Sequence, residues 1–432
     1  MPFVVELARD LIRLDTTNPP GEERIAVEHI ERLLRDAHID FARYESEPGR
    51  PNLVARVKGR GEAPPLLLQG HVDVVTTVNQ EWRHRPFGGD IVDGYLWGRG
   101  ALDMKSGVAM MVAALIRAQA RGGAPGDLVL AVLADEEAGG IAGARWLVDA
   151  HPELFTGIRH AIGESGGVTL HIGGRRFYPI MVSEKRGCQM VVTLRGAGGH
   201  GSIPAHGGAM AKLGALLTKL DGSRLPVHIT TPVRQQLERM RDALDEPLKG
   251  NFGALLDAAR ADTALSELGP MNRGLDAALH NTVNATIVSG GLKVNVIPSE
   301  VRVQLDGRLL PGFGPEDMVR ELRNVIGPEP EIEVTLVGPA QPEVDLSQFD
   351  LFASVLKDAD AGCVPLPSLV TGGTDARHFA RLGIRTYGFL PLNVPADFNS
   401  SSTIHAADER VPVNALEFGA DCVYEAVMRY RG

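Results

Sequence analysis

The chain reads Leu66-Leu67-Leu68-Gln69-Gly70-His71-Val72-Asp73, an apolar run that ends on a histidine and is followed by an aspartate. The run predicts a strand, and side-chain alternation near its end can leave His71 and Asp73 on one face. A carboxylate beside a histidine commonly fixes the tautomer and orientation of a metal-binding ring. Alone, a His-X-Asp pattern is more often an ordinary surface or core pair. It indicates a metal site only if further ligands follow.

Further acidic residues and one histidine do follow, at predicted strand ends and in loops. They are Asp103, Asp135, Glu136, Glu137, Glu164 and His405. Two divalent ions about 3.5–4 Å apart can activate a water molecule and polarise the carbonyl of an amide. Such a pair needs His, Asp or Glu ligands, one carboxylate that bridges the ions, and a separate carboxylate that takes the proton of the water. The sequence therefore predicts a two-metal hydrolase site.

Composition limits the other functions that the chain could have. The 432 residues, 44% hydrophobic and 23% charged, are ordinary for a globular protein and suffice for two domains. The net charge of −10 and the absence of a basic run argue against a nucleic-acid partner. No apolar run approaches the ~20 residues that span a bilayer, and the N-terminus does not resemble a signal peptide. With three widely spaced cysteines, we expect a cytoplasmic protein without a membrane partner.

The order of the predicted elements indicates an α/β sheet in the first part of the chain. Helical spacing and apolar runs alternate, and the polar clusters follow the strands, so the site should lie at the carboxyl edge of the sheet. Helices are predicted at 3–14, 24–38, 104–121 and 141–150, and strands at 52–57, 65–69, 127–134 and 160–164.

The pattern changes near residue 185, where strands group around helices. We expect strands at 187–195, 283–288, 293–297 and 300–305 and helices at 208–220 and 232–244, which together form an inserted α+β domain over 185–308. After Pro311 the α/β character returns, with helices at 315–326, 350–359 and 413–430 and a strand at 331–337. The predicted catalytic domain is therefore 1–184 together with 309–432.

Several motifs, in order along nearly the whole chain, resemble the M20 family of co-catalytic zinc peptidases and deacylases. The family includes glutamate carboxypeptidase, aminoacylase, succinyl-diaminopimelate desuccinylase and acetylornithine deacetylase. The matching segments are 70–75, 93–107, 135–140, 163–167, 199–204, 295–298, 372–377 and 403–405. The resemblance implies a zinc-peptidase catalytic domain, with a mixed sheet flanked by helices, and an inserted α+β lid domain through which the protein forms a homodimer.

The resemblance also implies the metal ligands. One zinc ion would be held by His71, Asp103 and Glu164, and the other by Asp103, Glu137 and His405, with Asp103 bridging the two. Cobalt or manganese could suit the same nitrogen and oxygen ligands.

Other roles carried over from the family are catalytic. Glu136 would be the general base and then the general acid, and Asp73 would orient His71. His200, in a glycine-rich loop of the insert, would help to stabilise the oxyanion, acting on the site of the partner subunit. The peptide bond between Asp103 and Met104 is expected to be cis.

Four further positions match residues that reach the substrate. Arg308 would bind a terminal carboxylate through paired hydrogen bonds, although a surface ion pair with Asp306 is the plain alternative. Asn295 would contact the substrate, and Gly373 and Thr374 would offer donors to the same carboxylate.

These expectations define a two-metal amidohydrolase that cleaves N-acyl amino acids or short peptides with a free C-terminal carboxylate. A biosynthetic deacylase of the acetylornithine or succinyl-diaminopimelate type, or a dipeptidase, is the alternative, although those deacylases tend to lack an insert as long as the segment around Thr231–Leu279. Carbamoyl-amide hydrolases usually lack the Gly98–Lys105 pattern. A binding protein that lost the chemistry should also have lost a ligand or Glu136, and all of them are present.

Overall fold

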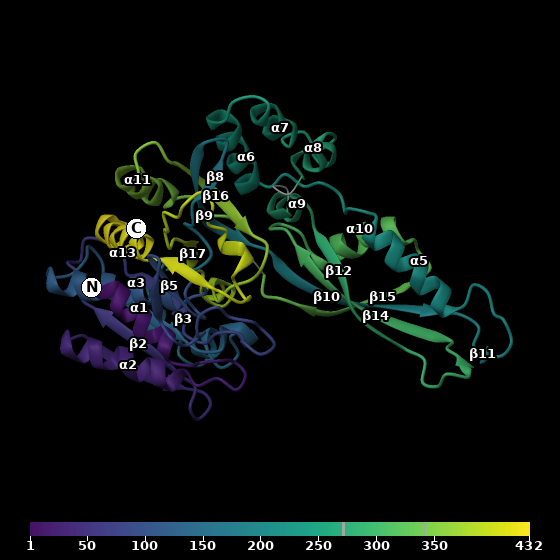
Figure 1. Cartoon of the computed structure of the whole chain (residues 1–432), viewed down its shortest axis with the longest axis horizontal. Coiled ribbons are helices and arrows are strands. Elements are labelled where there is room, and N and C mark those ends of the chain that lie inside the picture. Colours follow the sequence, from purple (N-terminus) through teal and green to yellow (C-terminus); the bar gives the residue numbers. More distant parts are fainter. Residues whose placement is uncertain (270–272, 341) are drawn as a thin grey trace. The chain divides into compact units, whose positions relative to one another are not determined.

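The computed structural model describes residues 1–269, 273–340 and 342–432. The chain forms two compact units, which are described separately here (Figure 1). Unit 1 comprises Met1–Val182, Asp345–Ser368 and Thr374–Gly432, and unit 2 comprises Ser183–Val344 and Leu369–Gly373.

Unit 1 is built on a nine-stranded mixed sheet with the order β1-β2-β6-β3-β7-β17-β9-β16, in which β8 also pairs with β9. The strands are β1 (Asp40–Glu45), β2 (Pro51–Val57), β3 (Leu66–His71), β6 (Leu128–Leu133), β7 (His160–Gly163), β8 (Leu170–Ile172), β9 (Arg175–Glu184), β16 (Val364–Val370) and β17 (Arg385–Gly388). β3 runs parallel to both β6 and β7, and β17 runs parallel to β7. Every residue of β3 and β6 is buried, as expected for parallel strands covered on both faces.

Helices cover both faces of this sheet, which confirms the predicted α/β class. They are α1 (Phe3–Arg13), α2 (Glu23–Asp36), α3 (Lys105–Ala120), α4 (Ala144–Ala150), α11 (Phe349–Ala359), α12 (Ala376–Phe379) and α13 (Val413–Arg429). On one face, Leu67 and Ala131 pack with Leu147 of α4 and Phe379 of α12. α3 contacts β3 and β6 and also packs against α1 and α13.

A small antiparallel sheet in unit 1 joins two distant loops. It contains β4 (Asp90–Val92), β5 (Tyr95–Trp97) and β18 (Arg410–Pro412), in the order β18-β5-β4. Because β18 pairs with β5, the loop that precedes β18 lies beside the loop that follows β5. The first loop carries His405 and the second carries Asp103.

Unit 2 contains a four-stranded antiparallel sheet in the order β12-β14-β10-β15. Its strands are β10 (Arg186–Arg195), β12 (Thr282–Gly290), β14 (Glu300–Leu309) and β15 (Glu331–Val337), and a separate pair is formed by β11 (Gly199–His200) and β13 (Val296–Ile297). The helices are α5 (Ala209–Asp221), α6 (Thr231–Ala243), α7 (Leu248–Ala254), α8 (Ala261–Leu268), α9 (Arg273–Leu279) and α10 (Pro315–Ile326). Among the described residues, none of these or the unit 1 helices has the length and apolar character needed to cross a membrane.

The structure corrects the predicted end of the insert at residue 308. β15 pairs with β10 in the unit 2 sheet, and Met318 and Leu322 of α10 pack into the core of that unit. Residues 309–344 therefore belong to unit 2, not to the catalytic domain as predicted. The predicted strand at 293–297 is also shorter, since only Val296–Ile297 pairs, with β11.

Candidate metal centre

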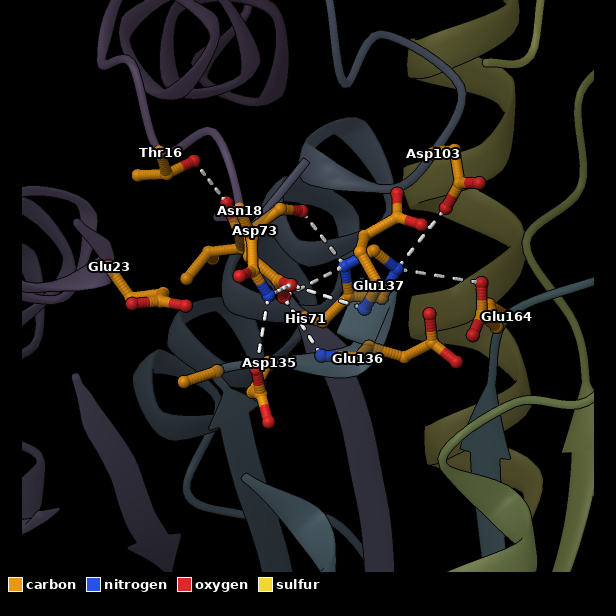
Figure 2. Close-up of polar contacts among 12 residues, drawn as sticks. Thr16, Asn18, Glu23, His71, Asp73, Asp103, Asp135, Glu136, Glu137 and Glu164 are labelled. Atoms are coloured by element: carbon orange, nitrogen blue, oxygen red, sulfur yellow. Dashed lines mark hydrogen bonds and ion pairs between the residues drawn. The ribbon is translucent and has the colours of Figure 1, made fainter. Parts of the chain in front are cut away.

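The carboxyl ends of three parallel strands meet at one edge of the unit 1 sheet. His71 is the last residue of β3, Glu136 and Glu137 follow β6, and Glu164 follows β7. Because β6 and β7 flank β3 in parallel register, the three strands deliver an imidazole and three carboxylates to the same place (Figure 2).

The two remaining candidate ligands come from the loops joined by the small sheet. Asp103 lies between β5 and α3, and its peptide bond with Met104 is cis, which confirms the prediction. His405 lies between the 3-10 turn Ser400–Ser402 and β18. The two oxygens of Asp103 face different histidines: Oδ1 lies 3.2 Å from Nε2 of His71, and Oδ2 lies 3.1 Å from Nε2 of His405.

The spacing of these atoms suits coordination of metal ions. Ligand atoms at about 2.0–2.2 Å from a tetrahedral zinc ion lie roughly 3.4 Å from one another. Nε2 of His71 lies 3.7 Å from a Glu164 oxygen, and Nε2 of His405 lies 3.2 Å from a Glu137 oxygen. Together with the two contacts of Asp103, these separations fit a pair of sites that share one carboxylate.

In the described part of the chain, two three-residue groups have their ligand atoms all within 4.8 Å of one another. One is His71, Asp103 and Glu137, and the other is His71, Glu136 and Glu164. These groups draw on the predicted residues but divide them differently, and one includes Glu136, the predicted base. The structure therefore brings together the residues of a candidate metal site.

Asp73 fixes both His71 and the acidic loop. Nδ1 of His71 hydrogen-bonds the backbone carbonyl of Asp73 at 3.0 Å and lies 3.4 Å from its carboxylate. As Nδ1 donates this bond, Nε2 is left with a lone pair for a cation. The carboxylate oxygens of Asp73 accept the backbone N–H groups of Glu136, at 3.1 Å, and Glu137, at 3.2 Å. One side chain thus orients a candidate ligand and the turn that carries two more.

Sequence reasoning missed the network behind Asp73. Nδ2 of Asn18 donates to Asp73 at 2.9 Å and to Asp135 at 3.1 Å. Arg50 pairs with Asp135 at 2.8 Å and with Glu23, which is fully buried, at 2.6 Å. Asn18 lies between the helices predicted at 3–14 and 24–38, next to two prolines, and a single asparagine there gives no signal of its partners.

Glu409 is a second residue that the sequence did not reveal. Its carboxylate accepts the backbone N–H groups of Leu102 at 2.6 Å, Asp103 at 3.1 Å and Gly100 at 3.2 Å, and it pairs with Arg99 at 2.5 Å. Both Glu409 and Arg99 are buried. The pair holds the backbone of the loop that presents Asp103. Four residues after His405, Glu409 looks like any acid in a polar loop.

The electrostatics of the cluster favour a cation. Burial and the nearby charge of Glu164 raise the pKa of Glu136 to about 9. Hydrogen bonds to Asp103 and Glu137 raise the pKa of His405 to about 10. The effects of Asp103 and Glu137 on His405, and of Glu164 on Glu136, indicate a negative potential in the cluster. A cation bound there would relieve that potential. Arg377 lies near Glu136, with 3.7 Å between charged atoms.

The predicted catalytic residue His200 and two of the four predicted substrate residues, Asn295 and Arg308, belong to unit 2. His200 and Asn295 lie on the exposed β11–β13 segment, where the N–H of Gly201 donates to the carbonyl of Asn295 at 2.9 Å. Nδ1 of His200 contacts the hydroxyl of Ser202 at 2.7 Å. Arg308, on β14, pairs with Asp306 at 3.0 Å, which is the plain alternative considered for it.

The other two predicted substrate residues lie at the end of the segment after β16. Gly373 falls in unit 2 and Thr374 in unit 1. Thr374 is buried, and its hydroxyl oxygen accepts the N–H of Ala376 at the start of α12, at 3.1 Å. The structure therefore gives Thr374 a local role in the turn.

Comparison with known proteins identifies the family. Residues 67–429 match the model of peptidase family M20/M25/M40. The chain is 25% identical to an N-fatty-acyl-amino acid synthase/hydrolase of Xenopus tropicalis, over 96% of this chain and 83% of that protein. It is 29% identical to a succinyl-diaminopimelate desuccinylase of Cereibacter sphaeroides, over 96% and 95% of the two chains. An M20 metallo-carboxypeptidase of Sulfolobus solfataricus has the same fold, with a TM-score of 0.70, 16% identity and 99% of both chains covered.

The chain thus belongs to peptidase family M20, as its motifs predicted. It is a hydrolase of peptide or related amide bonds.

Proposed function

We propose that this enzyme is a two-metal amidohydrolase acting on N-acyl amino acids or short peptides that end in a free carboxylate. The observation that carries the proposal is the position of Asp103, whose two oxygens contact His71 and His405 at 3.2 and 3.1 Å. A carboxylate placed this way can serve two ions at once. Zinc is our first choice of metal, with cobalt or manganese as alternatives.

In the proposed mechanism, His71, Asp103 and Glu164 would hold one ion, and Asp103, Glu137 and His405 the other. The metal ions would supply an activated water nucleophile and a polarised substrate carbonyl. Glu136 accepts the proton of the attacking water and delivers it to the nitrogen of the leaving amine. Asp73 keeps His71 and the Glu136 turn in place through the bonds described above.

Residues of unit 2, together with Thr374 of unit 1, would recognise the rest of the substrate. We propose that Arg308 and Asn295, with the backbone of Gly373 and the hydroxyl of Thr374, bind the terminal carboxylate, and that His200 stabilises the oxyanion. Arg308 would have to exchange its pairing with Asp306 for the substrate. The half-exposed state of both side chains, 37% and 36%, supports such an exchange.

We also propose a homodimer formed through unit 2. β12 is an edge strand of its sheet, and Ile287 and Val288 on it are 53% and 49% exposed. An exposed apolar edge strand is a ready template for pairing with a second copy. His200 would then act on the site of the partner subunit. We place the protein in the cytoplasm, since Cys188, Cys363 and Cys422 are free thiols.

The test is hydrolysis of a substrate panel by the purified protein supplied with Zn²⁺ or Co²⁺. The panel contains N-acetyl and N-succinyl amino acids and dipeptides, so that it separates an aminoacylase from a desuccinylase and a dipeptidase. Glu136→Gln should lower kcat by 10²-fold or more, whereas Glu153→Gln, at a side chain that is 67% exposed, should not. Full activity of Glu136→Gln would show that the proposed base is wrong.

A further inference from the structure

A pocket lies beside Asp103 and Glu164 within unit 1. Its volume is about 330 Å³, at the lower end of the range for small-molecule sites. Both carboxylates belong to its lining, and all of its lining residues come from unit 1. A substrate whose scissile amide lies at these carboxylates can therefore place one of its two halves in the pocket.

The walls of the pocket are mainly apolar. They include Met110, Leu170, Leu390, Leu392 and Ile404. Among the described residues that line it, the only charged side chains are those of Asp103 and Glu164. The buried hydroxyl of Ser106, 2% exposed, has no hydrogen-bond partner in the described part of the chain, and Ser165 and Ser400 also line the pocket.

This lining selects against a charged ligand. A carboxylate moved from water into an apolar site without a partner is strongly disfavoured. Away from the proposed metal ions, the lining offers the distal carboxylate of a succinyl group no cationic side chain. An aliphatic chain would bury apolar surface instead, with a gain for each methylene group.

The amino-acid half of the substrate is proposed to bind outside this pocket. Under the proposed function, its carboxylate binds to Asn295 and Arg308, which belong to unit 2. We infer that the unit 1 pocket receives the acyl half and that the enzyme prefers N-acyl amino acids with an unbranched aliphatic acyl chain longer than acetyl. The volume of about 330 Å³ leaves room for an acyl chain of several carbon atoms. This inference rests on the proposed function.

A chain-length series tests the inference in the metal-loaded enzyme. N-acetyl, butyryl, hexanoyl, octanoyl, decanoyl and succinyl derivatives of one amino acid are compared by kcat/KM. We expect a rise of roughly fourfold for each methylene group, which corresponds to about 0.8 kcal/mol, then a plateau, with the succinyl derivative below butyryl. A flat or falling series, or a dependence confined to the side chain of the amino acid, would overturn the inference.

A matched pair of variants places the effect in this pocket. Leu170, which lines it, is 40% exposed, and Leu382, which does not line it, is 37% exposed. Leu170→Arg should abolish the gain with chain length and raise the succinyl-to-octanoyl ratio at least tenfold, whereas Leu382→Arg should change neither. An unchanged chain-length profile in Leu170→Arg would refute the assignment.

Hydrolysis and binding measurements together show whether the pocket assignment or the proposed function is wrong. If acetyl derivatives are cleaved without any gain for longer chains, only the pocket assignment fails. If nothing in the series is cleaved, the proposed function fails, and calorimetry of octanoyl and acetyl derivatives with Glu136→Gln still decides the pocket. Tighter binding of the octanoyl derivative, lost in the double variant with Leu170→Arg, supports it. Equal affinities contradict it.

Discussion

The carboxylate of Glu409 accepts a hydrogen bond from the backbone N–H of Asp103 at 3.1 Å, although 306 positions separate the two residues. The same oxygen accepts the N–H of Leu102 at 2.6 Å. The proposed bridging ligand is therefore held through its main chain, and its side chain remains free to face both histidines. Partners of this kind commonly affect metal affinity or activity by 10–100-fold.

Glu409→Gln should lower metal affinity and kcat/KM by about 10–100-fold, because an uncharged amide is a weaker acceptor and leaves Arg99 without its countercharge. Competition with a chelator measures the affinity. Asp358→Asn, which breaks an ion pair with Arg429 at a 65% exposed carboxylate, is the control. Equal metal affinity in both variants would contradict the role given to Glu409.

Asn18→Ala should destabilise the protein by about 1–3 kcal/mol, since it removes the donor that two buried carboxylates share. Urea unfolding measures the loss. We also expect a lower kcat with little change in KM, because Asp73 then holds the Glu136 turn less firmly. A stability loss without any change in kcat would limit Asn18 to a structural role.

Removal of metal should abolish hydrolysis, and added Zn²⁺, Co²⁺ or Mn²⁺ should restore it to different extents. The melting temperature should also fall, since an ion at 100 times its Kd stabilises the folded state by about 2.7 kcal/mol. Calorimetry of the chelator-treated and reloaded protein, with metal analysis, gives the stoichiometry. Two ions per chain are expected. A single ion would exclude the shared role of Asp103.

The protein should lose stability at acidic pH because the folded state keeps His378 unprotonated. Burial and the charge of Arg377 lower the pKa of His378 to about 4. The ordinary pKa is near 6.5, so between pH 6.5 and 4 the unfolded chain binds the extra proton and the folded state loses up to about 3 kcal/mol. The difference between the unfolding free energies at pH 7 and pH 4.5 should be smaller in His378→Gln than in the natural chain. Equal pH dependence would rule this residue out.

The proposed dimer can be tested at the edge strand. Ile287→Lys places a charge on β12 and should shift the protein to monomer, because edge lysines oppose strand pairing. Leu336→Lys, on the opposite edge strand β15 and 57% exposed, should not. Sedimentation at several concentrations measures the assembly. A natural chain that is monomeric at micromolar concentration would refute the proposal.

The sequence predicted the parts of the site that follow strands. His71 and Glu164 end apolar runs, so parallel pairing of β3 with β7 was enough to bring them together. Their motifs also carried the family resemblance, which the comparisons confirm.

The parts that were missed depend on contacts distant in sequence. The helix and strand at 315–326 and 331–337 were expected where they occur, but nothing local shows that β15 pairs with β10. Likewise, Asn18 and Glu409 acquire their roles only from partners that the folded chain supplies.

The pairing of β18 with β5 has a consequence for synthesis of the protein. A nascent chain that ends at Thr403 already contains Asp103, Glu137 and Glu164. It still lacks His405 and also Glu409, whose carboxylate holds the Asp103 loop. The proposed metal centre therefore cannot be completed until the last part of the chain has been synthesised, so metal loading would be a late step in maturation and shorter nascent chains would have no hydrolytic activity.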